Sequence, residues 1–147
     1  MKLKLLFLIL STILISNACK KESQAEIDQQ KIEEYISTNN IDSVQISSTG
    51  LYYKILRTGN STYPTISNQV TVNYKGYFLD GKVFDSGDNK SFPLSRVIAG
   101  WQEGLQYIGE GGKIQLFVPS ALFMVIKVLV VFLQIVYLFE VDLIDVL

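Results

Sequence analysis

The pattern of apolar and polar residues changes twice along the chain. An apolar run over residues 5–15 opens the sequence, directly after Lys2 and Lys4. Residues 20–30 are polar and charged, a composition that buries too little apolar surface to fold alone. After Gly50 the chain consists of short β-rich runs separated by Gly, Asn, Asp and Ser. The pattern predicts a leader over residues 1–18, a tether with a short helix over residues 19–44, and one domain over residues 45–147.

Two helices are expected from the spacing of apolar residues. The first covers residues 25–37 and has only a narrow apolar side, so we expect it to pack on one side rather than form a coiled coil. The second covers residues 97–108, where Ile98, Trp101, Leu105 and Ile108 recur at intervals of three and four. This second helix can lay one apolar face on a sheet.

Antiparallel strands are expected at residues 51–56, 70–78 and 113–118. In residues 70–78, Val and Tyr alternate with polar residues, so one side of the strand faces a core and the other faces solvent. Asp80 and Gly81 follow this strand and predict a hairpin with a type I′ turn, which needs positive φ at both central residues.

The leader has the features of a secretory signal, and its end resembles the lipobox of bacterial lipoproteins. Its apolar core is shorter than the roughly 20 residues of a transmembrane helix. Ala18 precedes Cys19, the single cysteine of the chain. The resemblance implies cleavage after residue 18 and acylation of Cys19, which would anchor the mature protein to a membrane. An ordinary cleaved signal that leaves a free thiol is the alternative.

Composition then restricts the chemistry that the domain can perform. The chain has 147 residues, a net charge of -1, one Cys and no His. It therefore has no Ser-His or Cys-His pair, no thiolate zinc site and no internal disulfide. The charge balance does not favour nucleic acid. The glycines suit backbone turns rather than a phosphate loop. Any function must use apolar surface and a few polar groups.

Five fragments of the sequence occur in an order and at a spacing that resemble FKBP-type peptidyl-prolyl cis-trans isomerases. They are Val-Asn-Tyr-Lys-Gly at 72–76, Asp-Gly-Lys-Val-Phe-Asp-Ser at 80–86, Val-Ile-Ala-Gly-Trp-Gln-Glu-Gly-Leu at 97–105, Gly-Gly-Lys with Val-Pro-Ser at 111–113 and 118–120, and Phe-Glu-Val-Asp-Leu-Ile-Asp-Val at 139–146. The resemblance implies an α+β fold in which a twisted antiparallel sheet, an FKBP-like half-barrel, wraps around one short helix. A substrate pocket lies between sheet and helix, and no cofactor or metal is implied.

The resemblance also assigns roles to individual side chains. It implies a catalytic group, with Trp101 as the floor under a proline ring and with Asp85 and the backbone N–H of Ile98 as polar contacts; its members are Asp85, Tyr74, Phe84, Trp101 and Ile98. It implies further substrate-binding walls at Phe92, Val97 and Phe139. Without the resemblance, aromatic residues at alternating strand positions would be interpreted as core, and Asp85 as a turn residue.

The sequence departs from the family pattern after Leu122. The family continues with a polar loop that carries Tyr-Gly and Ile-Pro-Pro-Asn, whereas residues 121–139 here are almost entirely apolar. Codons formed across the boundaries of residues 123–137 can encode the missing loop, so we expect this stretch to be out of frame between two compensating single-base changes. If the stretch is genuine, reduced or absent activity is expected. A membrane span over residues 121–139 is another interpretation, which the expected last strand opposes.

These observations predict an isomerase that accelerates rotation about X-Pro bonds in exported proteins. Its expected partners are proline-containing polypeptides and, through lipidated Cys19, the periplasmic face or outer surface of a bacterial membrane. Neither nucleic acid nor an oligomer is indicated. The alternative is a non-catalytic FKBP-like chaperone that binds peptides in the same pocket.

Overall fold

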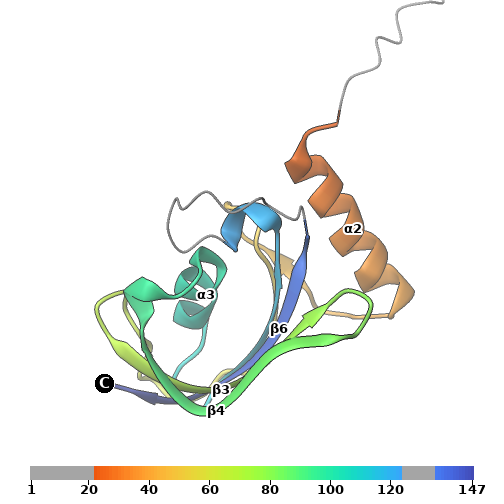
Figure 1. Cartoon of the computed structure of the whole chain (residues 1–147). Coiled ribbons are helices and arrows are strands. Elements are labelled where there is room, and N and C mark those ends of the chain that lie inside the picture. Colours follow the sequence, from red (N-terminus) through yellow and green to blue (C-terminus); the bar gives the residue numbers. More distant parts are fainter. Residues whose placement is uncertain (1–21, 124–134) are drawn as a thin grey trace, which may run out of the picture.

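The computed structural model describes residues 22–123 and 135–147. Its strands form one six-stranded antiparallel sheet in the order β1-β2-β5-β6-β3-β4. The strands are β1 (Gln45–Ile46), β2 (Tyr52–Arg57), β3 (Gln69–Phe78), β4 (Val83–Pro93), β5 (Lys113–Val118) and β6 (Tyr137–Val146). The sheet curves around the short helix α3 (Ala99–Gly104), while α2 (Gln24–Thr38) lies outside the curve (Figure 1). The predicted fold class is confirmed.

Several of the expected features fall outside the described residues. These are the signal peptide at 1–18, the lipid attachment site Cys19, and residues 124–134 of the stretch thought to be out of frame. Within residues 22–123 and 135–147, the structure has no helix whose length and apolar character would suffice to cross a bilayer.

The inner core lies between α3 and the concave side of the sheet. Alternate residues of β3 face it, and Val70 and Val72 are completely buried. Leu105 and Ile108 continue the buried side of the helix. The predicted helix over 97–108 is therefore confirmed in place, although α3 begins at Ala99 and its end tightens into a 3₁₀ turn over Leu105–Tyr107. The three predicted strands agree with β2, β3 and β5 to within one residue at each end.

Helix α2 packs against the outer side of the sheet. Its first turn is closed by a capping box, in which the Ser23 side chain accepts from the Glu26 N–H and the Glu26 carboxylate accepts from the Ser23 N–H. Ile32 is completely buried in an outer cluster with Tyr52 and Phe117. The expected helix at 25–37 is present and packed on one side. The structure places this helix against the sheet, and the tether expected over residues 19–44 stays a prediction.

The β3–β4 hairpin has a different turn from the predicted one. Gly81 has φ +87°, whereas Asp80 is not in the left-handed region. The Gly81 N–H donates to the Phe78 carbonyl and the Phe78 N–H donates to the Lys82 carbonyl, each at 2.9 Å. This is a three-residue loop that ends in a left-handed glycine, so the type I′ prediction is wrong. The longer loop lets Leu79 pack against the outer cluster.

The last strand contradicts the interpretation of residues 121–139 as a membrane span. Ser120–Leu122 forms a 3₁₀ turn, and Tyr137–Val146 forms β6, which pairs with both β3 and β5. The interval between these elements is shorter than the roughly 20 residues that a transmembrane helix needs. The strand expected at the C-terminal end of the chain thus lies at the centre of the sheet.

Candidate functional site

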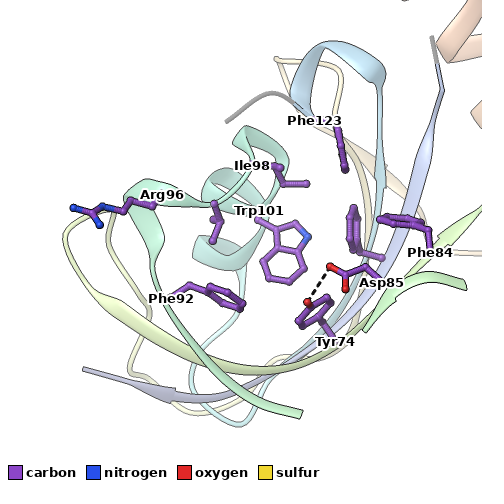
Figure 2. A pocket seen from close by; sticks show the side chains of 10 residues that line it. Tyr74, Phe84, Asp85, Phe92, Arg96, Ile98, Trp101 and Phe123 are labelled. Carbon is purple, nitrogen blue, oxygen red and sulfur yellow. Dashed lines mark hydrogen bonds between the residues drawn. The ribbon is translucent and has the colours of Figure 1, made fainter. Parts of the chain in front are cut away.

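A pocket of about 240 Å³ lies between α3 and the concave face of the sheet (Figure 2). The structure brings together around it all the side chains that the sequence singled out, namely Tyr74, Phe84, Asp85, Phe92, Val97, Ile98, Trp101 and Phe139. Arg96 and Phe123 also line it, and sequence reasoning did not include them. Most of the lining is aromatic or aliphatic, so the pocket suits an apolar group.

Trp101 forms the floor of this pocket. Its side chain is 4% exposed and is held by edge-to-face contacts, with ring centroids 5.1 Å from Tyr74 and 5.4 Å from Phe139. Such contacts favour one orientation of the indole. The indole N–H is buried and has no hydrogen-bond partner among the described residues. A carbonyl group that enters the pocket would therefore meet an unpaired donor.

The wall beside the floor depends on Gly76 in β3. A Cβ atom at this position would lie 2.7 Å from the Phe84 ring and 2.8 Å from the Phe139 ring. These distances are shorter than real Cβ contacts allow. Glycine at position 76 therefore lets the two rings lie directly over the strand, with their centroids 5.5 Å apart.

A bulge in β4 lets neighbouring residues face the same pocket. Gly76 pairs with Asp85 and Tyr77 pairs with Val83, so Phe84 is an extra residue in the ladder. In a regular strand, adjacent side chains point to opposite faces of the sheet. Because a bulge re-aims the side chains around it, Phe84 and Asp85 can both line the pocket.

The Asp85 carboxylate is held by two hydrogen bonds. The Tyr74 hydroxyl donates to one oxygen at 3.0 Å, and the Ser86 N–H donates to the other at 2.9 Å. Burial, and secondly the bond to the Asp85 carboxylate, raise the pKa of Tyr74. Tyr74 consequently remains protonated at neutral pH and continues to donate. This pair places one oriented carboxylate among mostly apolar walls.

The start of α3 presents a free backbone donor. Ile98 is the residue that precedes the helix, and its carbonyl accepts from the N–H groups of Trp101 and Gln102 at 2.9 and 3.0 Å. The Ile98 N–H donates to no group within the described parts of the chain. The Gln102 side chain donates to the Val97 carbonyl at 2.8 Å and so steadies the segment before the helix. The Ile98 N–H is thus available to a ligand.

Helix α3 is fixed from its outer side by Glu103. Its carboxylate accepts from the Thr49 hydroxyl at 2.5 Å and from the Tyr107 hydroxyl at 2.7 Å. Burial opposes ionisation here, but hydrogen bonds from Thr49, Ser47 and Tyr107 outweigh it and lower the pKa of Glu103. Glu103 therefore remains charged at neutral pH and ties the helix that carries Trp101 to the loop before β2.

Phe123 closes the pocket on the side of Phe84. Its ring stacks on Tyr137 with centroids 3.8 Å apart and lies 6.3 Å from Phe84. The family pattern could not indicate this residue, because position 123 begins the stretch where the sequence leaves that pattern. Arg96 could have been found, since it directly precedes the Val97-Ile98 motif.

Comparisons with known proteins agree with this geometry. Residues 60–123 match the family described as FKBP-type peptidyl-prolyl cis-trans isomerase. Over 108 residues the chain is 41% identical to the probable FKBP-type peptidyl-prolyl cis-trans isomerase FkpA of Neisseria meningitidis, an alignment that covers 70% of this chain and 40% of the relative. Over 115 residues it is 34% identical to the outer membrane protein MIP of Legionella longbeachae, with coverage of 75% and 49%.

A solved structure gives the same result for the fold. The crystal structure of FkpA from Escherichia coli superposes with a TM-score of 0.67 at 36% identity, covering 84% of this chain and 60% of that one. The chain spans less than half the length of the two curated relatives. The family match, the identity to these relatives and the shared fold together show that the chain belongs to the FKBP-type peptidyl-prolyl cis-trans isomerase family.

Proposed function

We propose that this protein accelerates cis-trans isomerisation of X-Pro bonds in polypeptides outside the cytoplasm. The observation that carries the proposal is the pocket itself, in which apolar walls surround one oriented carboxylate and lie beside one unpaired backbone N–H. Isomerisation needs no proton transfer to the protein. The activity is therefore compatible with a chain that contains no His.

The geometry suggests how the barrier is lowered. Rotation about a peptide bond costs about 18–20 kcal/mol because resonance gives the C–N bond partial double-bond character. We propose that the proline ring rests on Trp101 while the Ile98 N–H binds a substrate carbonyl. Twisting localises the lone pair on nitrogen and weakens the polar amide, so a dry apolar pocket disfavours the planar ground state more than the twisted transition state. Asp85 supplies the only carboxylate that lines the pocket within the described residues.

A short X-Pro peptide assay tests this proposal. Asp85→Ala removes the carboxylate and the partner of Tyr74, and Trp101→Ala removes the floor. We expect Asp85→Ala to lower kcat/KM by about ten- to a hundredfold, the range for losing a hydrogen bond to a charged group. We expect Trp101→Ala to lower kcat/KM as well, because the proline ring loses the apolar surface on which it rests. Asp80→Ala, at the tip of the β3–β4 hairpin and outside the pocket lining, is the matched control. Unchanged rates in both pocket variants would reject the enzymatic function.

The same proteins distinguish catalysis from simple peptide binding. Trp101 is the only tryptophan of the chain, so its fluorescence reports binding in the pocket. If the wild type binds proline peptides and suppresses aggregation of an unfolded substrate without accelerating isomerisation, the non-catalytic chaperone is the correct function. If the wild type accelerates isomerisation in proportion to pocket occupancy, the enzymatic function is the correct one.

We also propose that residues 1–18 direct export and that acylated Cys19 anchors the protein to a bacterial membrane. The arguments are the short apolar leader, the single Cys after Ala18, and a relative whose name is outer membrane protein MIP. Metabolic labelling with palmitate is expected to label the wild type and not Cys19→Ser. Cys19→Ser should also leave the membrane fraction for the soluble extracytoplasmic fraction. An unchanged distribution in the variant would reject the lipid anchor.

The stretch over residues 123–137 is proposed to be out of frame. Two observations support this: the family match ends at residue 123, and β6, which follows the stretch, pairs with both β3 and β5. Resequencing codons 115–140 decides the matter. A restored Tyr-Gly and Ile-Pro-Pro loop would support the proposal, whereas the sequence as written would reject it. A protein carrying the restored loop is expected to exceed the present chain in kcat/KM.

A further inference from the structure

We infer that Arg96 gives the pocket a preference for polypeptides that carry a carboxylate side chain next to the proline. The inference rests on the proposed isomerase function and adds a substrate class to it. Arg96 lines the same pocket as Asp85 and Trp101 but lies at its outer edge.

The two charged residues of the pocket differ in whether they already have partners. Asp85 and Arg96 are the two charged residues that line it within the described parts of the chain. Asp85 is already engaged by the Tyr74 hydroxyl and the Ser86 N–H. Arg96 is exposed and forms neither an ion pair nor a hydrogen bond with any residue in 22–123 and 135–147. The pocket therefore has one unsatisfied charge, and it is positive.

The position of Arg96 determines which part of a substrate it can meet. In Figure 2 its guanidinium points away from Trp101, toward the outside of the pocket. A proline ring on the floor would not reach it, but the residue before or after the proline would pass the rim. The backbone of Arg96 is anchored, because Arg96 ends the 3₁₀ turn Leu94–Arg96, whose first residue, Leu94, is completely buried.

The chemistry of the side chain favours a carboxylate as its partner. A guanidinium presents N–H donors in a planar fork that matches the two oxygens of a carboxylate. The chain as a whole has a net charge of -1, so its overall field does not attract acidic peptides. Any preference for acidic substrates must therefore arise locally at Arg96.

The test compares peptides that differ only beside the proline. One pair has Glu or Gln before the proline, and a second pair has Glu or Gln after it; the readout is the ratio of kcat/KM within each pair. For the wild type at low salt we expect a ratio of about two to five in favour of Glu in at least one pair, the range for an exposed ion pair. The ratio should approach one in 1 M salt, because screening acts within about 3 Å there.

Variants assign the preference to Arg96. Arg96→Gln is expected to bring the ratio to one, Arg96→Lys to keep part of it, and Arg96→Glu to invert it. Lys82→Gln makes the same change of net charge at an exposed side chain outside the pocket lining, and should keep the wild-type ratio. A wild-type ratio of one in both pairs, or a ratio unchanged by Arg96→Gln, overturns the inference.

A binding measurement keeps this inference separate from the proposed activity. Titration of Trp101 fluorescence with the same peptides gives Kd ratios even for a variant without turnover. No acceleration with any peptide would reject the isomerase function, whereas a Glu preference in Kd that Arg96→Gln abolishes would still support the role of Arg96. Acceleration without any Glu preference would support the isomerase function and reject the role of Arg96.

Discussion

We expect Gly76→Ala to displace two pocket rings and so to lower activity by more than its loss of stability alone explains. The added methyl would lie 2.7 Å from the Phe84 ring and 2.8 Å from the Phe139 ring, whereas ordinary contact begins near 3.4 Å. Each ring must therefore retreat by about 0.6–0.7 Å. Both rings are stiff and both line the pocket, so the shift is transmitted to the site.

The expected magnitudes follow from packing and positioning. Adding a methyl to a well-packed region costs about 1–3 kcal/mol of unfolding free energy. A displacement of 1 Å at a reacting site can cost about a hundredfold in rate, so displacements of this size predict a fall of about tenfold in kcat/KM. Urea denaturation measures the first quantity and the X-Pro peptide assay measures the second.

Ile32→Val is the matched control for stability. Ile32 is completely buried in the outer cluster and does not line the pocket. Its shortening costs about 0.5–1.5 kcal/mol, which overlaps the cost expected for Gly76→Ala. The control should lower stability and leave kcat/KM within twofold. Wild-type activity in Gly76→Ala, or an equal loss of activity in Ile32→Val, would refute the reasoning.

Three further predictions concern stability. Asp28→Ala is expected to lower the unfolding free energy by about 1–3 kcal/mol in urea, because Asp28 is 1% exposed and accepts from the N–H and hydroxyl of Ser120. Burial, then the bond to Glu33, raise the pKa of Tyr52 to about 12. The unfolded chain therefore loses this proton first, and stability should fall by about 2 kcal/mol between pH 10 and 12. Ser23→Ala should weaken the capping box by about 0.5–2 kcal/mol, seen as faster hydrogen exchange in the first turn of α2.

Each of these predictions has its own control. Glu34→Ala, on the exposed side of α2, should change the unfolding free energy by less than about 0.5 kcal/mol, and an equal effect in both variants would contradict the role of Asp28. Tyr52→Phe should remove the part of the stability loss between pH 10 and 12 that Tyr52 causes. An unaltered dependence of the unfolding free energy on pH would contradict the assignment of that loss to Tyr52. Protection unchanged by Ser23→Ala would show that the cap does not hold the first turn.

Most of the helices and strands and most of the pocket residues could be predicted from the sequence. Apolar periodicity located α2, α3, β2, β3 and β5, because side-chain direction repeats every 3.6 residues in a helix and every two in a strand. The pocket residues were reached differently, through motifs such as Val97-Ile98 and Asp85-Ser86 that resemble a known family. Neither periodicity nor composition alone would have separated Trp101 from an ordinary core residue.

Some features depended on contacts between segments that lie far apart in the chain. The turn at Gly81 has three residues, and this longer loop lets Leu79 pack onto the outer cluster. Phe84 and Asp85 share a pocket because the ladder between β3 and β4 shifts by one residue. A local pattern contains no information on such a shift.

Helix α2 also shows the difference between what the local sequence determines and what tertiary contacts determine. The sequence by itself determined that residues near 24–38 form a helix, since capping and propensity act within a few residues. Its place on the sheet was decided by Ile32 in the outer cluster and by Asp28, which binds Ser120 across 92 residues of sequence. Local hydrogen bonds and side-chain periodicity can be predicted from the sequence. The bulge in β4, the docking of α2 and the position of Arg96 at the pocket rim depend on contacts between segments that are distant in the sequence.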